Sequence, residues 1–142
     1  MITFFSPEHE RHAPEIEFFR GRPVPCFESP ARARIVREEL LARGHELREP
    51  GRDATPFLRK VHSLRYLAFL EAAWGLWVAE DPAHATVQPF PAVWPVRTLR
   101  SDAEPHDFVA RLGLYSMDDG SPLVEGTWAA AKAAADAAAS AA

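Results

Sequence analysis

Residues 61–80 read VHSLRYLAFLEAAWGLWVAE, and this stretch says most about the fold. Large apolar side chains recur at the three- and four-residue spacing of one helix face, at Leu67, Leu70, Trp74 and Trp77. A serine directly before Leu64 fits the start of a helix. We therefore predict a helix over residues 64–80, and we interpret the apolar stripe as core packing.

Two short strands and another helix are predicted on the N-terminal side of this helix. Ile2–Phe5 is an apolar run that predicts a buried strand, and residues 45–49 predict a second one. Between them Ser29 fits a helix N-cap, Pro30 fits the first helical position, and Gly44 fits the left-handed residue that ends a helix.

Two proline-rich stretches show no period. Residues 7–30 predict a long ordered loop, and residues 81–112 predict an irregular segment whose length is uncommon in a compact domain unless it has a function. We expect that function to be a contact with a partner. After Thr127, a plausible N-cap, the chain is mostly alanine, and its polar residues recur every fourth position at Lys132, Asp136 and Ser140.

Composition excludes several classes of protein. The 142 residues are 47% hydrophobic and 25% charged, which excludes a disordered chain and a coiled coil. No apolar run approaches the roughly 20 residues that cross a membrane. With a net charge of −4 and no basic stripe, neither a nucleic-acid nor a membrane partner is expected. The N-terminus lacks a secretory signal, so a cytoplasmic location is the expectation.

The residues alone offer no complete catalytic or metal-binding set. His9 and His12 are three apart, whereas the zinc-protease pattern needs two histidines four apart on a helix. A nucleophile elbow, a P-loop and a dinucleotide fingerprint are also absent from the sequence. We therefore assign no catalytic residue and no metal ligand to this chain.

Carboxylates close to aromatic residues are the clearer signal. Glu17 and Glu28 bracket Phe18, Phe19 and Phe27. Carboxylates supply charge and aromatic faces supply contact area for a cationic ligand. The alternative is that both carboxylates pair with nearby arginines, which are Arg20, Arg22 and Arg32.

Several short motifs follow one another in an order typical of one enzyme family. They are Ser6-Pro7-Glu8-His9, Pro25-Cys26-Phe27-Glu28, Val61-His62-Ser63, Trp94-Pro95-Val96-Arg97, Arg111-Leu112-Gly113-Leu114-Tyr115-Ser116 and Gly126-Thr127-Trp128. The chain resembles the N-terminal portion of the acetylpolyamine amidohydrolases, which belong to the histone deacetylase superfamily. The resemblance extends over nearly the whole chain.

The resemblance implies an α/β fold, namely the N-terminal part of an arginase/deacetylase-like parallel sheet, here mostly helices and long loops with one or two short strands. It implies hydrolysis of an acetylated polyamine, or another small cationic amide, by a zinc-activated water. It also implies substrate-binding roles: Glu17 would favour cationic amines, Phe27 would line the substrate tunnel and Asp118 would lie near its mouth. Residues 81–112 would form the insertion that makes a dimer.

The departures from the family pattern limit what this chain does alone. The Gly-His-His and Asp-x-His-His-Gly motifs that carry the family's histidine pair and zinc ligands do not occur in it. Zinc is thus expected in the complete family enzyme, and residues 1–142 are expected to form an incomplete domain that is inactive alone. Val109 stands where relatives often have an acidic residue, and Cys26 stands where they often have proline.

Three interpretations remain open. The chain is a truncated or interrupted amidohydrolase, one half of a split deacetylase, or a non-catalytic module for polyamine binding or dimerisation. In each case the central strands of the sheet are missing. We therefore expect marginal stability, or association with a second copy or with the missing C-terminal portion.

Overall fold

The computed structural model describes residues 1–96, 98, 102–120 and 122–142. Its elements in chain order are β1 (Ile2–Phe4), the 3₁₀ helix η1 (Pro7–Arg11), β2 (Ile16–Phe19), β3 (Arg22–Pro25), α1 (Pro30–Ala42), β4 (Glu46–Arg48), α2 (Thr55–Val61), α3 (Leu64–Glu80), the 3₁₀ helix η2 (Pro82–Thr86), α4 (Phe108–Tyr115) and α5 (Thr127–Ala141). This is the mixture of helices and short strands that was expected. None of the described helices is both long and apolar enough to cross a membrane.

The described chain divides into two compact units. Unit 1 comprises residues 1–13, 28–71 and 125–142, and unit 2 comprises residues 14–27 and 72–124. In the predicted insertion 81–112, Arg97 and residues 99–101 lie outside the described residues, as does residue 121 further along.

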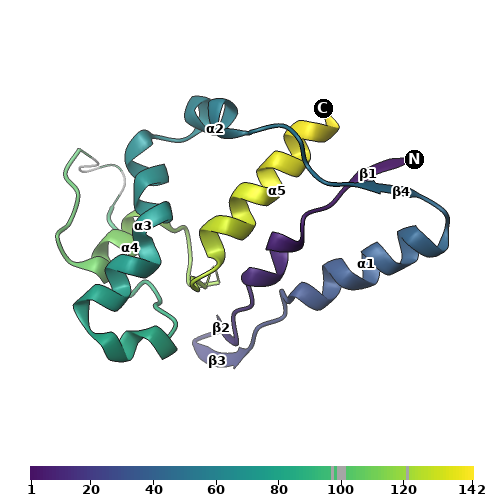
Figure 1. Ribbon diagram of the computed structural model, residues 1–142. Helices are drawn as coiled ribbons and strands as arrows, with labels where there is room; N and C mark the ends of the chain where they lie inside the picture. The colour runs from purple at the N-terminus through teal and green to yellow at the C-terminus, as the bar shows by residue number, and fades with distance from the viewer. Residues whose placement is uncertain (97, 99–101, 121) are drawn as a thin grey trace. The chain divides into compact units, whose positions relative to one another are not determined.

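Unit 1 is built on a parallel pair of strands, β1 and β4 (Figure 1). The register places Ile2 opposite Glu46 and Phe4 opposite Arg48. Parallel strands need a crossover, and α1 provides it. As predicted, Ser29 is the N-cap of α1, and Gly44 follows the helix with a φ of +71°.

The prediction that Ile2–Phe5 is a buried strand was wrong in one respect. The strand exists, but the side chain of Ile2 is 49% exposed. A parallel strand becomes buried when neighbouring strands and helices cover it on both faces. Among the described residues β1 pairs with β4 alone, so this cover is incomplete.

The alanine-rich helix α5 packs on η1 and β1 within unit 1 (Figure 1). Its N-cap is Gly126 and not Thr127, a correction of one residue. A side chain at Gly126 would overlap the carbonyl of Arg11, so only glycine allows this close approach. The hydroxyl of Thr127 instead contacts the ring Nδ1 of His12 at 3.0 Å.

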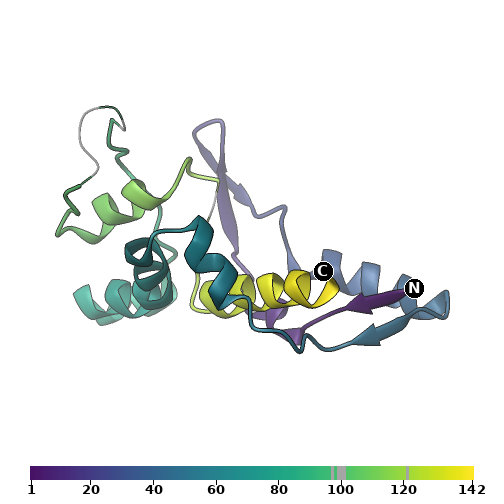
Figure 2. The same cartoon turned by 90° about the horizontal axis from the view of Figure 1, so that it is seen from above.

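Unit 2 contains an antiparallel hairpin, β2–β3, which stands out in Figure 2. The prediction of a long ordered loop without regular elements over residues 7–30 was therefore wrong, since that range holds both η1 and this hairpin. The turn residues Arg20 and Gly21 both have positive φ, as tight two-residue hairpin turns require. Because strands seldom contain proline, Pro23 and Pro25 concealed β3 in the sequence.

The core of unit 2 gathers around the second half of α3. Trp77, Phe108, Leu112 and Leu123 are all buried there. The predicted helix over residues 64–80 is confirmed. Its buried positions are Phe69, Ala73 and Trp77, however, while Leu67, Leu70 and Trp74 are half-buried. The predicted irregular stretch 81–112 is shorter than expected, since η2 and the start of α4 lie inside it.

Candidate functional site

Glu17 lies in β2, and its carboxylate binds the segment that follows β3. Oε2 accepts hydrogen bonds from the backbone N–H of Phe27 at 3.4 Å and from the thiol of Cys26 at 3.3 Å. Two of the three predicted substrate-binding residues, Glu17 and Phe27, therefore meet through a direct contact.

The thiol of Cys26 acts as a hydrogen-bond donor at this site. Burial raises the pKa of Cys26 to about 11, and both the hydrogen bond to Glu17 and its negative charge contribute to the rise. The thiol is therefore protonated at neutral pH, and it supplies the carboxylate with a proton donor and no second negative charge.

Two exposed aromatic residues lie close to Glu17 in the chain: Phe19, two residues later on β2, and Phe27, whose N–H donates to the carboxylate. The side chain of Phe27 is 67% exposed, and that of Phe19 is 53% exposed. Side chains alternate along a strand, so Phe19 shares the face of Glu17, whereas Phe18 lies on the other face. A carboxylate bordered by exposed aromatic rings suits a ligand that carries an ammonium group on an apolar chain.

Asp118, the third predicted substrate-binding residue, follows α4 in unit 2. It is exposed, and its Oδ1 accepts a hydrogen bond from the N–H of Gly120 at 3.0 Å, within its own turn. The contacts described for the chain connect it to neither Glu17 nor Phe27.

The arginine alternative applies to one of the two glutamates. Glu28, which belongs to unit 1, forms an ion pair with Arg32 one helical turn later. The partners given for Glu17 are the thiol of Cys26 and the amide of Phe27, and neither is cationic.

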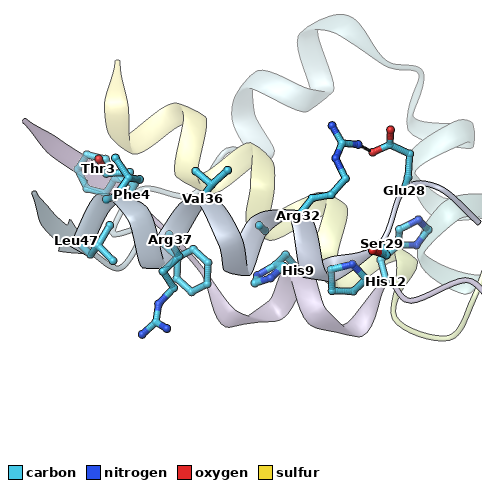
Figure 3. Close-up of a pocket in the computed structure, with 14 residues that line it drawn as sticks. Thr3, Phe4, His9, His12, Glu28, Ser29, Arg32, Val36, Arg37 and Leu47 are labelled. Carbon is cyan, nitrogen blue, oxygen red and sulfur yellow. Dashed lines mark ion pairs between the residues drawn. The ribbon is translucent and has the colours of Figure 1, made fainter. Parts of the chain in front are cut away.

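Unit 1 carries a groove of about 510 Å³ between β1 and α1 (Figure 3). His9 and His12 line it together with apolar side chains such as Phe4, Val36 and Leu47. Each histidine has one ring nitrogen engaged: Nδ1 of His9 lies 2.8 Å from the carbonyl of Ser6, and Nδ1 of His12 contacts Thr127. Burial lowers the pKa of His12, which favours the neutral ring.

The donor set needed for zinc does not come together in this part of the molecule. Within residues 1–96, 98, 102–120 and 122–142, no group of three or more His, Cys, Asp or Glu side chains is placed to hold a metal ion. A catalytic zinc site takes three protein ligands and a water. The described residues therefore do not fit zinc.

The sequence analysis did not identify Gln88 and Phe90, which contact strand β2 of the hairpin. The side-chain amide of Gln88 makes hydrogen bonds to the backbone of Glu15 and Ile16, and the ring of Phe90 packs edge-on against Phe18 at 4.8 Å. In the sequence Gln88 lies between Val87 and Pro89, a context that indicates nothing about its partners without the fold.

Proteins with similar sequences share one name. The chain is 39% identical over 131 residues to acetylpolyamine amidohydrolase 2 of Pseudomonas aeruginosa, covering 92% of this chain and 37% of that protein. It is 34% identical to acetylpolyamine amidohydrolase 1 of the same organism, which it also covers to 37%. No protein-family model matches the chain. The chain thus spans little more than a third of the length of these curated relatives.

A solved structure of a protein with the same kind of name matches the fold of this chain. The crystal structure of an acetylpolyamine aminohydrolase from Burkholderia pseudomallei matches with a TM-score of 0.83 and 28% identity, over 99% of this chain and 40% of that one. The predicted α/β fold class is thereby confirmed. The predicted resemblance is confirmed as well: the chain is a relative of the acetylpolyamine amidohydrolases and corresponds to a portion of them.

Proposed function

We propose that this chain supplies the ligand-facing hairpin of an amidohydrolase that removes acetyl groups from polyamines or other small cationic amides. The observation that carries the proposal is the match of 92% of the chain to relatives named for this activity. The site supports it, since Glu17 lies beside exposed aromatic rings. A cytoplasmic location is part of the same proposal.

The hairpin would bind the cationic end of such a ligand. The carboxylate of Glu17 attracts an ammonium group, and its Oε2 is held by two donors from the chain's own loop. The exposed ring of Phe27 can cover the methylene groups between the nitrogens, whereas the ring of Phe19 already carries the guanidinium of Arg20, 5.3 Å from its centroid. Asp118 would attract a second ammonium group of a longer polyamine, because its carboxylate is exposed.

No step of the hydrolysis is assigned to the described residues. In the complete family enzyme, zinc would activate the attacking water. Since the described side chains form no suitable ligand group, zinc would need ligands from other residues. We therefore propose that the chain is inactive alone and that its own contribution is to bind and orient the amine.

The insertion 81–112 would contribute a contact between copies of the chain. Three of its large side chains are exposed to a substantial extent, namely Val93, Trp94 and Val96. Exposed apolar side chains that cluster in sequence are typical of protein interfaces. Light scattering on Trp94→Ser should show a smaller mean mass than the unmodified chain if this contact forms.

Titration with spermidine tests the ligand-binding part of the proposal. Glu17→Gln keeps the shape and removes the charge, so we expect binding to weaken roughly tenfold, as for the loss of one charge-assisted hydrogen bond. Glu49→Gln removes an exposed carboxylate outside the site and should leave the affinity unchanged. Equal affinities for the unmodified chain and Glu17→Gln would contradict the proposal.

A second candidate, one half of a split deacetylase, is favoured by the open edge of β1. The amide of Phe5 donates to the carbonyl of Arg48, and the carbonyl of Met1 accepts from Glu46, so these odd-numbered residues face β4. Successive backbone groups of a strand alternate in direction, which turns those of Ile2 and Phe4 to the opposite edge. A further parallel strand could pair there.

The face of α1 offers apolar surface to the same partner. Ile35 is 66% exposed and Val36 is 59% exposed. Mixing the chain with the unmatched remainder of the Pseudomonas aeruginosa relative should give a complex in size-exclusion chromatography. Ile35→Asp should weaken that complex, and Arg59→Asp, at an exposed position on α2, should not. Separate elution of the two unmodified chains would exclude this candidate.

A further inference from the structure

Gln88 pairs with the hairpin in the way that a third strand would. Its Oε1 accepts hydrogen bonds from the N–H of Glu15 at 2.7 Å and of Ile16 at 3.2 Å, and its Nε2 donates to the carbonyl of Ile16 at 3.1 Å. A side-chain amide has the same donor and acceptor as a peptide group. It can therefore satisfy both backbone groups of one strand residue.

The register of the hairpin explains why Ile16 is available for this pairing. The amide of Cys26 donates to the carbonyl of Glu15 at 3.0 Å, while Ile16 lies opposite Pro25, which has no N–H. In an antiparallel pair the hydrogen-bonded positions alternate with non-bonded ones. The backbone groups of Ile16 therefore point to the outer edge of β2, where Gln88 meets them.

A ring contact holds the same side of the hairpin. Phe18 packs against Phe90 with their ring centroids 4.8 Å apart and nearly perpendicular. Gln88 thus binds the outer edge of β2, and Phe90 packs on the face of β2 from which Phe18 projects. Glu17 lies between Ile16 and Phe18 in β2. Its side chain projects from the face opposite to that of Phe18, and its carboxylate contacts Cys26 and Phe27.

We infer that Gln88 is a positioning residue for Glu17: it fixes β2 so that the carboxylate stays in contact with Cys26 and Phe27. This inference rests on the proposed function only for the ligand that Glu17 would then receive. Residues 88–90 of the insertion 81–112 would then have a second role, which is to order the ligand-facing hairpin of the same chain.

The reactivity of Cys26 reports this positioning without any ligand. Glu17 helps to raise the thiol pKa, and only the thiolate reacts with iodoacetamide. Glu17→Gln should therefore raise the alkylation rate at pH 8 and move the midpoint of its pH profile downward. Gln88→Ala should do the same, because a displaced carboxylate no longer binds the thiol. A drop of one unit in the thiol pKa corresponds to about a tenfold rise in rate.

The double variant separates positioning from mere loosening of the hairpin. If Gln88 acts through Glu17, Gln88→Ala will add little in the Glu17→Gln background. If it only keeps the hairpin folded, Gln88→Ala will shift the profile in both backgrounds, because Cys26 then loses its burial in each. Thr86→Ala, whose hydroxyl bonds to Ala83 within η2, is the matched control and should leave the profile unchanged.

Gln88→Glu provides a rescue. It keeps the acceptor oxygen for the N–H groups of Glu15 and Ile16 and loses only the donor to the carbonyl of Ile16. Gln88→Glu should therefore shift the alkylation profile of Cys26 less than Gln88→Ala does.

The two proposals fail in different ways. Non-additive alkylation profiles would support the positioning role of Gln88. If spermidine then fails to bind, the proposal that Glu17 receives a cationic ligand is overturned while the positioning role stands. Equal shifts of Gln88→Ala in both backgrounds, or no shift in either, would overturn the positioning role even if spermidine binds.

Discussion

The ammonium of Lys132 lies 2.7 Å from the carboxylate of Asp53, although 79 residues separate them in the chain. This ion pair is one of several contacts between the polar line of α5 and residues 51–54. Asp136 accepts a hydrogen bond from the N–H of Ala54, and the hydroxyl of Ser140 accepts from the N–H of Gly51. The line of polar residues spaced four apart thus holds the segment that leads into α2.

The charges of this cluster depend on one another. The hydrogen bond from Lys132 and those from Thr55 hold the pKa of Asp53 well below its usual range. Burial lowers the pKa of Lys132, but its hydrogen bonds to Asp136 and Asp53 outweigh burial and leave that pKa raised. Both groups are therefore charged across the physiological pH range.

Asp53→Asn is expected to lower the melting temperature at pH 7, since it removes the charge that Lys132 pairs with. Because the pKa of Asp53 is lower in the folded chain, the ionised form stabilises the fold above the unfolded pKa of about 3.9. That contribution is lost as the pH falls below this value. Thermal melts at pH 7 and at pH 3 should therefore show a difference between the two proteins that shrinks with acidification. Glu49→Gln, an exposed carboxylate of the preceding segment, should show no such difference.

Gly126→Ala and Gly75→Ala are expected to have opposite effects. A methyl group at Gly126 would overlap the carbonyl of Arg11, and overpacking of this kind costs about 1–3 kcal/mol of unfolding free energy. A methyl group at Gly75 meets nothing within 4 Å inside α3, so the better helix propensity of alanine should stabilise the chain by about 0.5–1 kcal/mol. Urea denaturation measures both. Equal effects would contradict the close approach of Arg11 and Gly126.

Trp77→Phe tests the core of unit 2. The indole Nε1 donates to the carbonyl of Val87 at 2.7 Å, and the ring stacks on His84 with centroids 3.5 Å apart. Phenylalanine loses this hydrogen bond, at a net cost of about 0.5–1.5 kcal/mol. Trp94→Phe, at a residue 42% exposed, should change the free energy of unfolding by less than about 0.5 kcal/mol. Comparable losses for the two variants would contradict the described packing.

Much of the fold could be predicted from local sequence signals. Pro30 and Gly44 mark the ends of α1 because each residue type suits the backbone of a helix end, and Ser29 takes the N-cap position although its side chain makes no capping hydrogen bond. The β2–β3 hairpin could not be predicted in this way. Its prolines occupy positions that bond to no partner strand, a fact that only the register reveals.

The candidate site was predictable only in part. The resemblance assigned substrate-binding roles to Glu17 and Phe27, and the structure adds their direct contact and the thiol of Cys26 as a donor to the same carboxylate. Gln88 is 72 residues from Ile16 in the chain, so no local pattern could connect them. Similarly, the spacing of Lys132, Asp136 and Ser140 indicated one polar face but not the backbone amides that it binds.

Acetate release from an acetylated diamine, measured on the purified chain alone with added zinc, tests the central claim most directly. We expect no hydrolysis above the buffer control, because the described residues form no group of three or more side chains that could hold a zinc ion. Turnover that persists through successive purification steps and falls in Glu17→Gln would contradict it.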